Sequence, residues 1–188
     1  MSELTPKDRA RSIAFIEQRP QLAFDFSVRK VISFGGYATG ASDKTIDQAI
    51  QRFELGAVES QPYGHLSVGQ QQRVSLTRAW AQIASNPQGY LLADEPSSAM
   101  DPKHVVHAMT QLKELAQTGI GVGIVMHDLN AALRWADHAI ILNQQGQIAK
   151  FASVDQAMTE SILSQVFEVT IRRHTLETGQ SVLIAEDT

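Results

Sequence analysis

Cysteine is absent from the 188 residues, which excludes disulfides and thiolate metal sites and is typical of a reducing compartment. The longest strongly apolar runs, such as Gly119 to Met126, are far shorter than the roughly 20 residues that a membrane span needs. The charged N-terminus has no apolar run behind it, so we expect no signal peptide. Any membrane role would therefore depend on a partner.

The sequence also has no excess of basic over acidic residues. The formal net charge of -4 gives no general attraction to nucleic-acid phosphates or anionic lipid, so we expect no nucleic-acid partner. The length, with 43% hydrophobic residues, suits one domain with room for an inserted subdomain, and it argues against two independent domains.

The first half of the chain is dominated by helix signals. A short strand is predicted at Ser12 to Ile16. After it, Ser27, Ser42 and Ser67 are each placed to cap a helix. The predicted helices run over 28–32, 43–53 and 68–84.

From Gly89 the pattern changes to apolar strands alternating with amphipathic helices. The predicted strands are 90–93, 121–126 and 138–142, and the helices are 102–117 and 129–135. This alternation predicts an α/β fold with a mainly parallel sheet and flanking helices. A turn at 143–146 and a returning strand at 147–151 follow, and the tail is predicted to form a small helix and one or two strands.

Two acids, Asp94 and Glu95, end an apolar strand. Ligand sites in open α/β sheets lie at the carboxyl ends of strands, so Asp94 is expected to help hold Mg²⁺ and Glu95 to act as a general base on water. The alternative is that Asp94, Glu95 and Pro96 only end the strand and begin a turn. Asp101 before Pro102 has a structural reason of its own, as a helix cap with proline at the first helical position.

Ser67 and Gln70 have the spacing of a capping box. Backbone N–H groups and the helix dipole make such a terminus suitable for an anion. Val68 between them would be strained if the position required positive φ, but would cost little in helical conformation, and we favour the helical alternative.

A phosphate loop of the form G-x-x-x-x-G-K-[ST] occurs nowhere in the sequence. The stretch Gly35 to Ser42 has a glycine pair at the right spacing, but Ala41 stands where the lysine is required. His104 and His107, three apart on a predicted helix, could be a metal pair but lack a third ligand, so a solvated helix face is expected.

Taken together, Leu66 to Val74 and Tyr90 to Asp101 resemble the signature motif, Walker B strand and D-loop of an ATP-binding-cassette (ABC) ATPase. Val68 departs from the glycine usual in that family. Gln18 resembles the Q-loop glutamine and His127 the switch histidine. The resemblance implies the C-terminal part of a RecA-like P-loop NTPase core, formed by residues 1–19 and 87–188, with an inserted helical subdomain at about 20–86.

The resemblance also implies roles at an ATP and Mg²⁺ site. Glu95 and His127 would be catalytic, and Asp94 and Gln18 would serve the metal. The residues expected to bind the cofactor are Gln18, Ser67, Gly69, Gln70, Asp94 and Asp101. In the family, the signature turn serves ATP held on the opposite subunit.

The sequence as a whole is most similar to the ATPases of bacterial haem, ferric-siderophore and cobalamin importers, and haem is the preferred cargo on overall likeness. The implied partners are transmembrane permease subunits, a second ATPase subunit and, indirectly, a periplasmic binding protein, at the cytoplasmic face of the bacterial inner membrane. Without a phosphate loop, we expect an N-terminally incomplete ATPase domain that is inactive alone. The alternative is a non-catalytic module that regulates an intact ABC ATPase or transporter.

Overall fold

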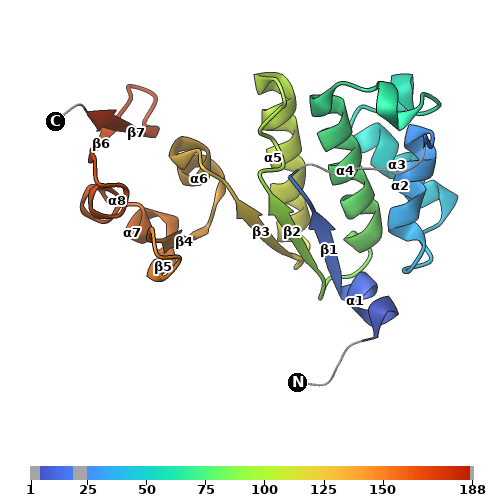
Figure 1. The fold of residues 1–188 in the computed structure, drawn as a ribbon, viewed down its shortest axis with the longest axis horizontal. Coiled ribbons are helices and arrows are strands. Elements are labelled where there is room, and N and C mark those ends of the chain that lie inside the picture. Colours follow the sequence, from blue (N-terminus) through green and yellow to red (C-terminus); the bar gives the residue numbers. More distant parts are fainter. Residues whose placement is uncertain (1–4, 19–24, 187–188) are drawn as a thin grey trace. The chain divides into compact units, whose positions relative to one another are not determined.

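The structure is a computed structural model that describes residues 5–18 and 25–186. The chain forms two compact units, Met1–Val125 and Met126–Thr188, and each is described by itself (Figure 1). The loop expected after the first strand lies partly outside the described residues, since Arg19 and Pro20 are not among them.

A parallel sheet lies at the centre of the first unit. It contains β1 (Ile13–Ile16), β2 (Tyr90–Asp94) and β3 (Gly121–Val125) in the order β1-β2-β3. Ile16 pairs with Ala93, and Asp94 pairs with Val125. The predicted parallel sheet is thus confirmed for these three strands.

Helices cover one face of this sheet. α4 (Val68–Ile83) packs on β1 and β2, and α5 (Pro102–Gln117) packs on β3 (Figure 1). The side chains on the covered face are buried: Ala14, Ile16, Leu91 and Ala93. The opposite face exposes large apolar groups: Ile13, Phe15, Tyr90, Leu92 and Val125. Parallel sheets are normally covered on both faces. In the part of the chain that the structure describes, this second face is uncovered.

The predicted helix caps are confirmed. Ser27, Ser42 and Ser67 each accept a hydrogen bond from a backbone N–H in the first turn of their helix. The capped helices are α2 (Val28–Gly36), α3 (Asp43–Arg52) and α4. Two 3-10 turns, η1 (Gly56–Val58) and η2 (Tyr63–His65), lead from α3 to α4.

The helix that precedes the first strand was not predicted. α1 (Pro6–Ser12) precedes β1, so the strand begins at Ile13 and Ser12 is helical. The hydroxyl of Thr5 accepts from the backbone nitrogen of Asp8 at 3.2 Å, and Pro6 occupies the first helical position. These are ordinary helix-start signals. The helix was not predicted because the apolar run directly after it was interpreted as a strand beginning at Ser12.

The second unit begins with α6 (Leu129–Trp135) and is built around two antiparallel pairs. β4 (His138–Leu142) pairs with β5 (Ile148–Ser153), and β6 (Thr170–Thr175) pairs with β7 (Ser181–Glu186). Two short helices, α7 (Val154–Ala157) and α8 (Glu160–Phe167), lie between these pairs in the chain. The core residues are Ile141, Ala157, Met158, Leu163, Ile171 and Leu183.

The expectation that residues 138–142 continue the parallel alternation is wrong for the described residues. The side chain of Asn143 accepts from the backbone nitrogens of Gln145 and Gln147, at 3.1 and 2.8 Å, and Gly146 has φ 73°. This tight turn directs the chain straight back, so β4 forms a hairpin with β5.

No helix within residues 5–18 and 25–186 has both the length and the apolar character that crossing a membrane requires.

Candidate functional site

The carboxyl edge of the parallel sheet carries the predicted acidic residues. Asp94 ends β2 and Glu95 follows it, while Gln18 lies two residues beyond the end of β1. Because Ile16 pairs with Ala93, Gln18 and Asp94 leave neighbouring strands at the same edge. This is the edge where open α/β sheets place ligands.

Glu95 has an uncommon backbone conformation, with φ 45°. Its N–H donates to the carbonyl oxygen of Val125 at 3.0 Å. Its own carbonyl oxygen accepts from the backbone nitrogen and the hydroxyl of Ser98, at 3.3 and 3.2 Å. A strained residue persists where its surroundings over-determine it, and these three bonds fix the backbone at Glu95.

The edge fits a magnesium ion only in part. No cluster of three or more His, Cys, Asp or Glu residues with metal-site geometry exists among the described residues. Mg²⁺ is usually held by one or two carboxylates, with waters and substrate phosphates completing its shell. Asp94 and Gln18 could supply oxygen ligands of that kind, and the remaining ligands would come from a nucleotide and water.

The signature turn forms the start of α4, as predicted. The amide nitrogen of Gln70 donates to the hydroxyl of Ser67 at 3.3 Å, and the amide nitrogen of Ser67 donates to Oε1 of Gln70 at 2.9 Å. The capping box is therefore confirmed. Val68 is the first residue of the helix and does not have positive φ, so the helical alternative holds.

First-turn N–H groups have no acceptor inside their own helix. That of Gln70 is satisfied by Ser67, which leaves those of Val68 and Gly69 directed out of the N-terminus. The helix dipole adds a partial positive charge at this point. The terminus can therefore receive an oxyanion.

The start of α4 also touches the turn after Glu95, which sequence reasoning missed. A methyl group on Gly69 would lie 2.5 Å from the carbonyl oxygen of Ala99. Gln72 donates to the hydroxyl of Ser98 and accepts from the amide nitrogen of Ala99, both at 3.0 Å. Only a polar side chain at 72, one turn after Gly69, could have signalled this contact.

Asp101 is the N-cap of α5, as its position before Pro102 predicts. Its carboxylate accepts from the backbone nitrogen of His104 at 3.1 Å and lies 2.5 Å from Nδ1 of that ring. The hydrogen bond from the His104 side chain, with a second from its backbone, lowers the pKa of Asp101 below the ordinary value.

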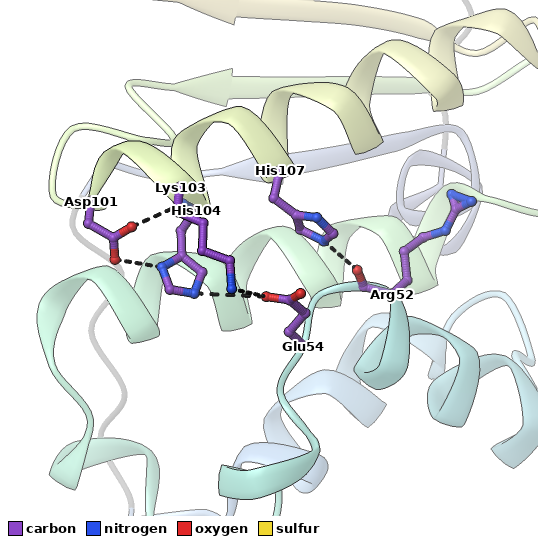
Figure 2. Close-up of polar contacts among 6 residues, drawn as sticks. All are labelled: Arg52, Glu54, Asp101, Lys103, His104 and His107. Carbon is purple, nitrogen blue, oxygen red and sulfur yellow. Dashed lines mark hydrogen bonds and ion pairs between the residues drawn. The ribbon is translucent and has the colours of Figure 1, made fainter.

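His104 and His107 join α5 to the segment after α3 (Figure 2). Glu54 lies 4.0 Å from Nε2 of His104 and 3.7 Å from Nζ of Lys103. Nε2 of His107 lies 2.7 Å from the carbonyl oxygen of Arg52. The expectation of a solvated helix face is wrong, because the loop at 52–54 packs against this side of α5.

A buried cation lies close to the same cluster. Arg73 on α4 is only 8% exposed. Burial lowers the pKa of its guanidinium, while the negative charges of Glu54 and Asp101 oppose that shift. Arg73 therefore links α4 electrostatically to both the loop at 52–54 and the cap of α5.

His127 is exposed and follows β3 by two residues. It belongs to the second unit, whereas Glu95 belongs to the first. The structure does not place His127 relative to Glu95, and the expected pairing of these residues stays a prediction.

The first unit has a three-stranded parallel sheet with acids at its carboxyl edge, next to a capped helix. This arrangement is that of an α/β domain of the kind that binds nucleotides. The structure resembles that of an inward-facing metal-chelate type ABC transporter, with TM-score 0.79, 23% identity, and coverage of 94% of this chain and 72% of that one. It also resembles a dimeric ATP-binding cassette bound to ADP and Pi, with TM-score 0.67, 26% identity, and coverage of 79% and 65%.

Sequence comparison gives the family. The family model for ABC transporter matches residues 1–98. Hemin import ATP-binding protein HmuV of Shewanella denitrificans is 38% identical over 164 residues, covering 84% of this chain. The protein of the same name from Chelativorans sp. is 31% identical over 195 residues, covering all of it. The chain belongs to the ABC transporter family, within its ATPase domains.

The match covers only part of the relatives. The chain spans 64% of the length of the Shewanella protein and 74% of the Chelativorans protein.

Proposed function

We propose that the protein is the ATP-binding and ATP-hydrolysing subunit of a bacterial ABC importer, with haem or another iron chelate as cargo. The observation that carries the ATPase part is the placement of Asp94 and Glu95 at the carboxyl edge of the parallel sheet. The names of the two HmuV relatives support the cargo.

The roles follow from the chemistry of each group. Asp94 and Gln18 would hold Mg²⁺, and Glu95 would polarise the attacking water as general base. His127 would contact the γ-phosphate and the water, as its resemblance to the switch histidine implies. Bound ATP supplies the phosphoryl group, and the chain's residues position and polarise the groups around it.

The ATP site is shared between two subunits. Ser67, Gly69 and Gln70 form a helix N-terminus that suits a phosphate, and Asp101 lies on the turn packed against it. The 188 residues contain no phosphate loop. Its lysine and backbone donors would come from outside this sequence, and three missing charge-assisted bonds of roughly 1.5 to 3 kcal/mol each would weaken ATP binding a thousandfold or more. We therefore propose that these residues hydrolyse ATP only where a phosphate loop from outside these 188 residues holds the nucleotide.

The partners are a second ATPase subunit and the permease subunits of the importer, with a periplasmic binding protein contributing indirectly. Together they would hold the chain at the cytoplasmic face of the inner membrane. The cargo would pass through the permease, so this chain needs no haem site.

The test is association driven by nucleotide. The chain is mixed with the Shewanella denitrificans HmuV and followed by analytical ultracentrifugation with and without MgATP. We expect a heterodimer that requires ATP and that is prolonged when the Walker B glutamate of the HmuV partner is replaced by glutamine, because that partner binds ATP without consuming it. Glu177→Gln of this chain, in the turn between β6 and β7, is the control and should not prolong it. Association of equal strength without nucleotide would contradict the proposal and favour the regulatory module.

A further inference from the structure

Gln72 is a buried amide that uses both ends of its side chain. It is 5% exposed on α4, and it donates from Nε2 to the hydroxyl of Ser98 and accepts at Oε1 from the amide nitrogen of Ala99, each at 3.0 Å. A buried amide without partners is costly. These two bonds therefore fix the side chain and the turn it holds to each other.

The contact continues to Glu95. The hydroxyl of Ser98, which accepts from Gln72, donates to the carbonyl oxygen of Glu95 at 3.2 Å. The hydrogen-bond chain thus runs from α4 to the residue with φ 45°. Its strained backbone needs a surrounding structure that holds it, and Gln72 is part of that structure.

A backbone contact lies beside the hydrogen bonds. Gly69, one turn before Gln72, approaches the carbonyl oxygen of Ala99 so closely that a methyl group would lie 2.5 Å from it. Two hydrogen bonds and this contact join the start of α4 to residues 98–99. An interface packed this closely transmits displacement, since neither side can shift alone without losing contacts.

We propose that Gln72 is a positioning residue that makes the signature turn and the turn at 95–101 move as one unit, so that a phosphate docking at Ser67 also fixes the carboxylate of Glu95. The catalytic consequence rests on the proposed function. The mechanical coupling does not.

The coupling is tested by amide hydrogen exchange, measured by NMR on the isolated chain. We expect Gln72→Leu to lower the protection of the Ala99 amide by about tenfold or more, because its acceptor is gone. Val105, which donates to the carbonyl oxygen of Asp101, should keep its protection. Gln72→Glu retains an acceptor and should restore protection at Ala99.

Gln71→Leu is the matched control. Gln71 is the adjacent residue of the same type, and its side chain donates to the carbonyl oxygens of Tyr63 and Leu66, both at 3.3 Å, and not to the 95–101 turn. Protection at Ala99 should be unchanged in this variant. Unchanged protection in Gln72→Leu, or an equal loss in Gln71→Leu, would overturn the coupling.

The catalytic arm uses the chain assembled with its permease and second ATPase subunit. We expect Gln72→Leu to lower kcat by about 10- to 100-fold with KM for MgATP unchanged, because misplacing a general base slows chemistry without weakening binding. Gln72→Glu should recover part of the rate. A rate equal to wild type would overturn the positioning role. An inactive wild-type assembly would instead overturn the proposed function, and the exchange result at Ala99 would still decide the coupling.

Discussion

Gly69 lies against Ala99 so closely that a methyl group on it would sit 2.5 Å from the Ala99 carbonyl oxygen. The glycine of the signature turn thus has a role inside its own chain, in addition to any role toward a nucleotide.

Gly69→Ala should therefore destabilise the fold. Crowding a packed backbone contact costs about 1–3 kcal/mol, which urea denaturation would measure. Gly56→Ala is the control, because no atom lies within 4 Å of a methyl group there, and it should change stability by no more than about 0.5 kcal/mol. Equal effects from the two substitutions would contradict the close contact.

Val68→Gly tests the conformation of the signature turn. Val68 is the first residue of α4 and is 62% exposed, so glycine should lower the free energy of unfolding by a few tenths of a kcal/mol. If Val68 were instead strained at positive φ, glycine would stabilise the protein. An increase in Tm would contradict the structure.

Asp101→Asn tests the charge at the cap of α5, since asparagine can still cap the helix. The folded-state pKa of Asp101 is lowered by its hydrogen bonds to His104. A lowered pKa gives stability that is complete above the unfolded value of about 3.9 and is lost as pH falls through the folded value.

Unfolding by urea at a series of pH values would measure this. The stability difference between wild type and Asp101→Asn should be largest near neutral pH and disappear in acid below that window. It should shrink in a His104→Ala background, because the hydrogen bond from that side chain is the first cause of the shift. If the stability difference between wild type and Asp101→Asn did not change with pH, the charge of Asp101 would not be its cause.

Glu54 interacts electrostatically with the buried cation of Arg73 and pairs with the exposed cation of Lys103. Arg73 is 8% exposed, whereas the Lys103 side chain, 3.7 Å from Glu54, is 75% exposed. Double-mutant cycles should give a coupling of about 0.5–3 kcal/mol between Glu54 and Arg73, and at most about 1 kcal/mol between Glu54 and Lys103. A larger value for the Lys103 cycle would show that burial does not strengthen the interaction.

The sequence predicted features that depend on neighbouring residues. The caps at Ser27, Ser42 and Ser67 and the start of α5 at Pro102 were all confirmed, because an N-cap needs only its own first turn. The strand pattern from Tyr90 onward likewise predicted the parallel pairing of β2 and β3.

Features that depend on distant residues could not be predicted in this way. Gln72 and Ala99 are 27 positions apart, and no local pattern shows which turn a helix face will meet. The positive φ of Glu95 is held by Val125 and Ser98, which lie on different elements. The turn at 143–146 and the returning strand after it were predicted correctly, but β4 was also expected to extend the parallel sheet, because its apolar residues suit a parallel strand equally well.

The central claim is that Asp94 and Glu95 act on ATP whose phosphates are held by a phosphate loop from outside these 188 residues. The most direct measurement is ATP turnover by this chain joined at its N-terminus to a phosphate-loop segment and assembled with the permease subunits and a second ATPase subunit whose own Walker B glutamate is replaced by glutamine. We predict turnover that falls to background when this chain also carries Glu95→Gln and is retained with Glu177→Gln. Turnover that is equal with and without Glu95→Gln would contradict the account.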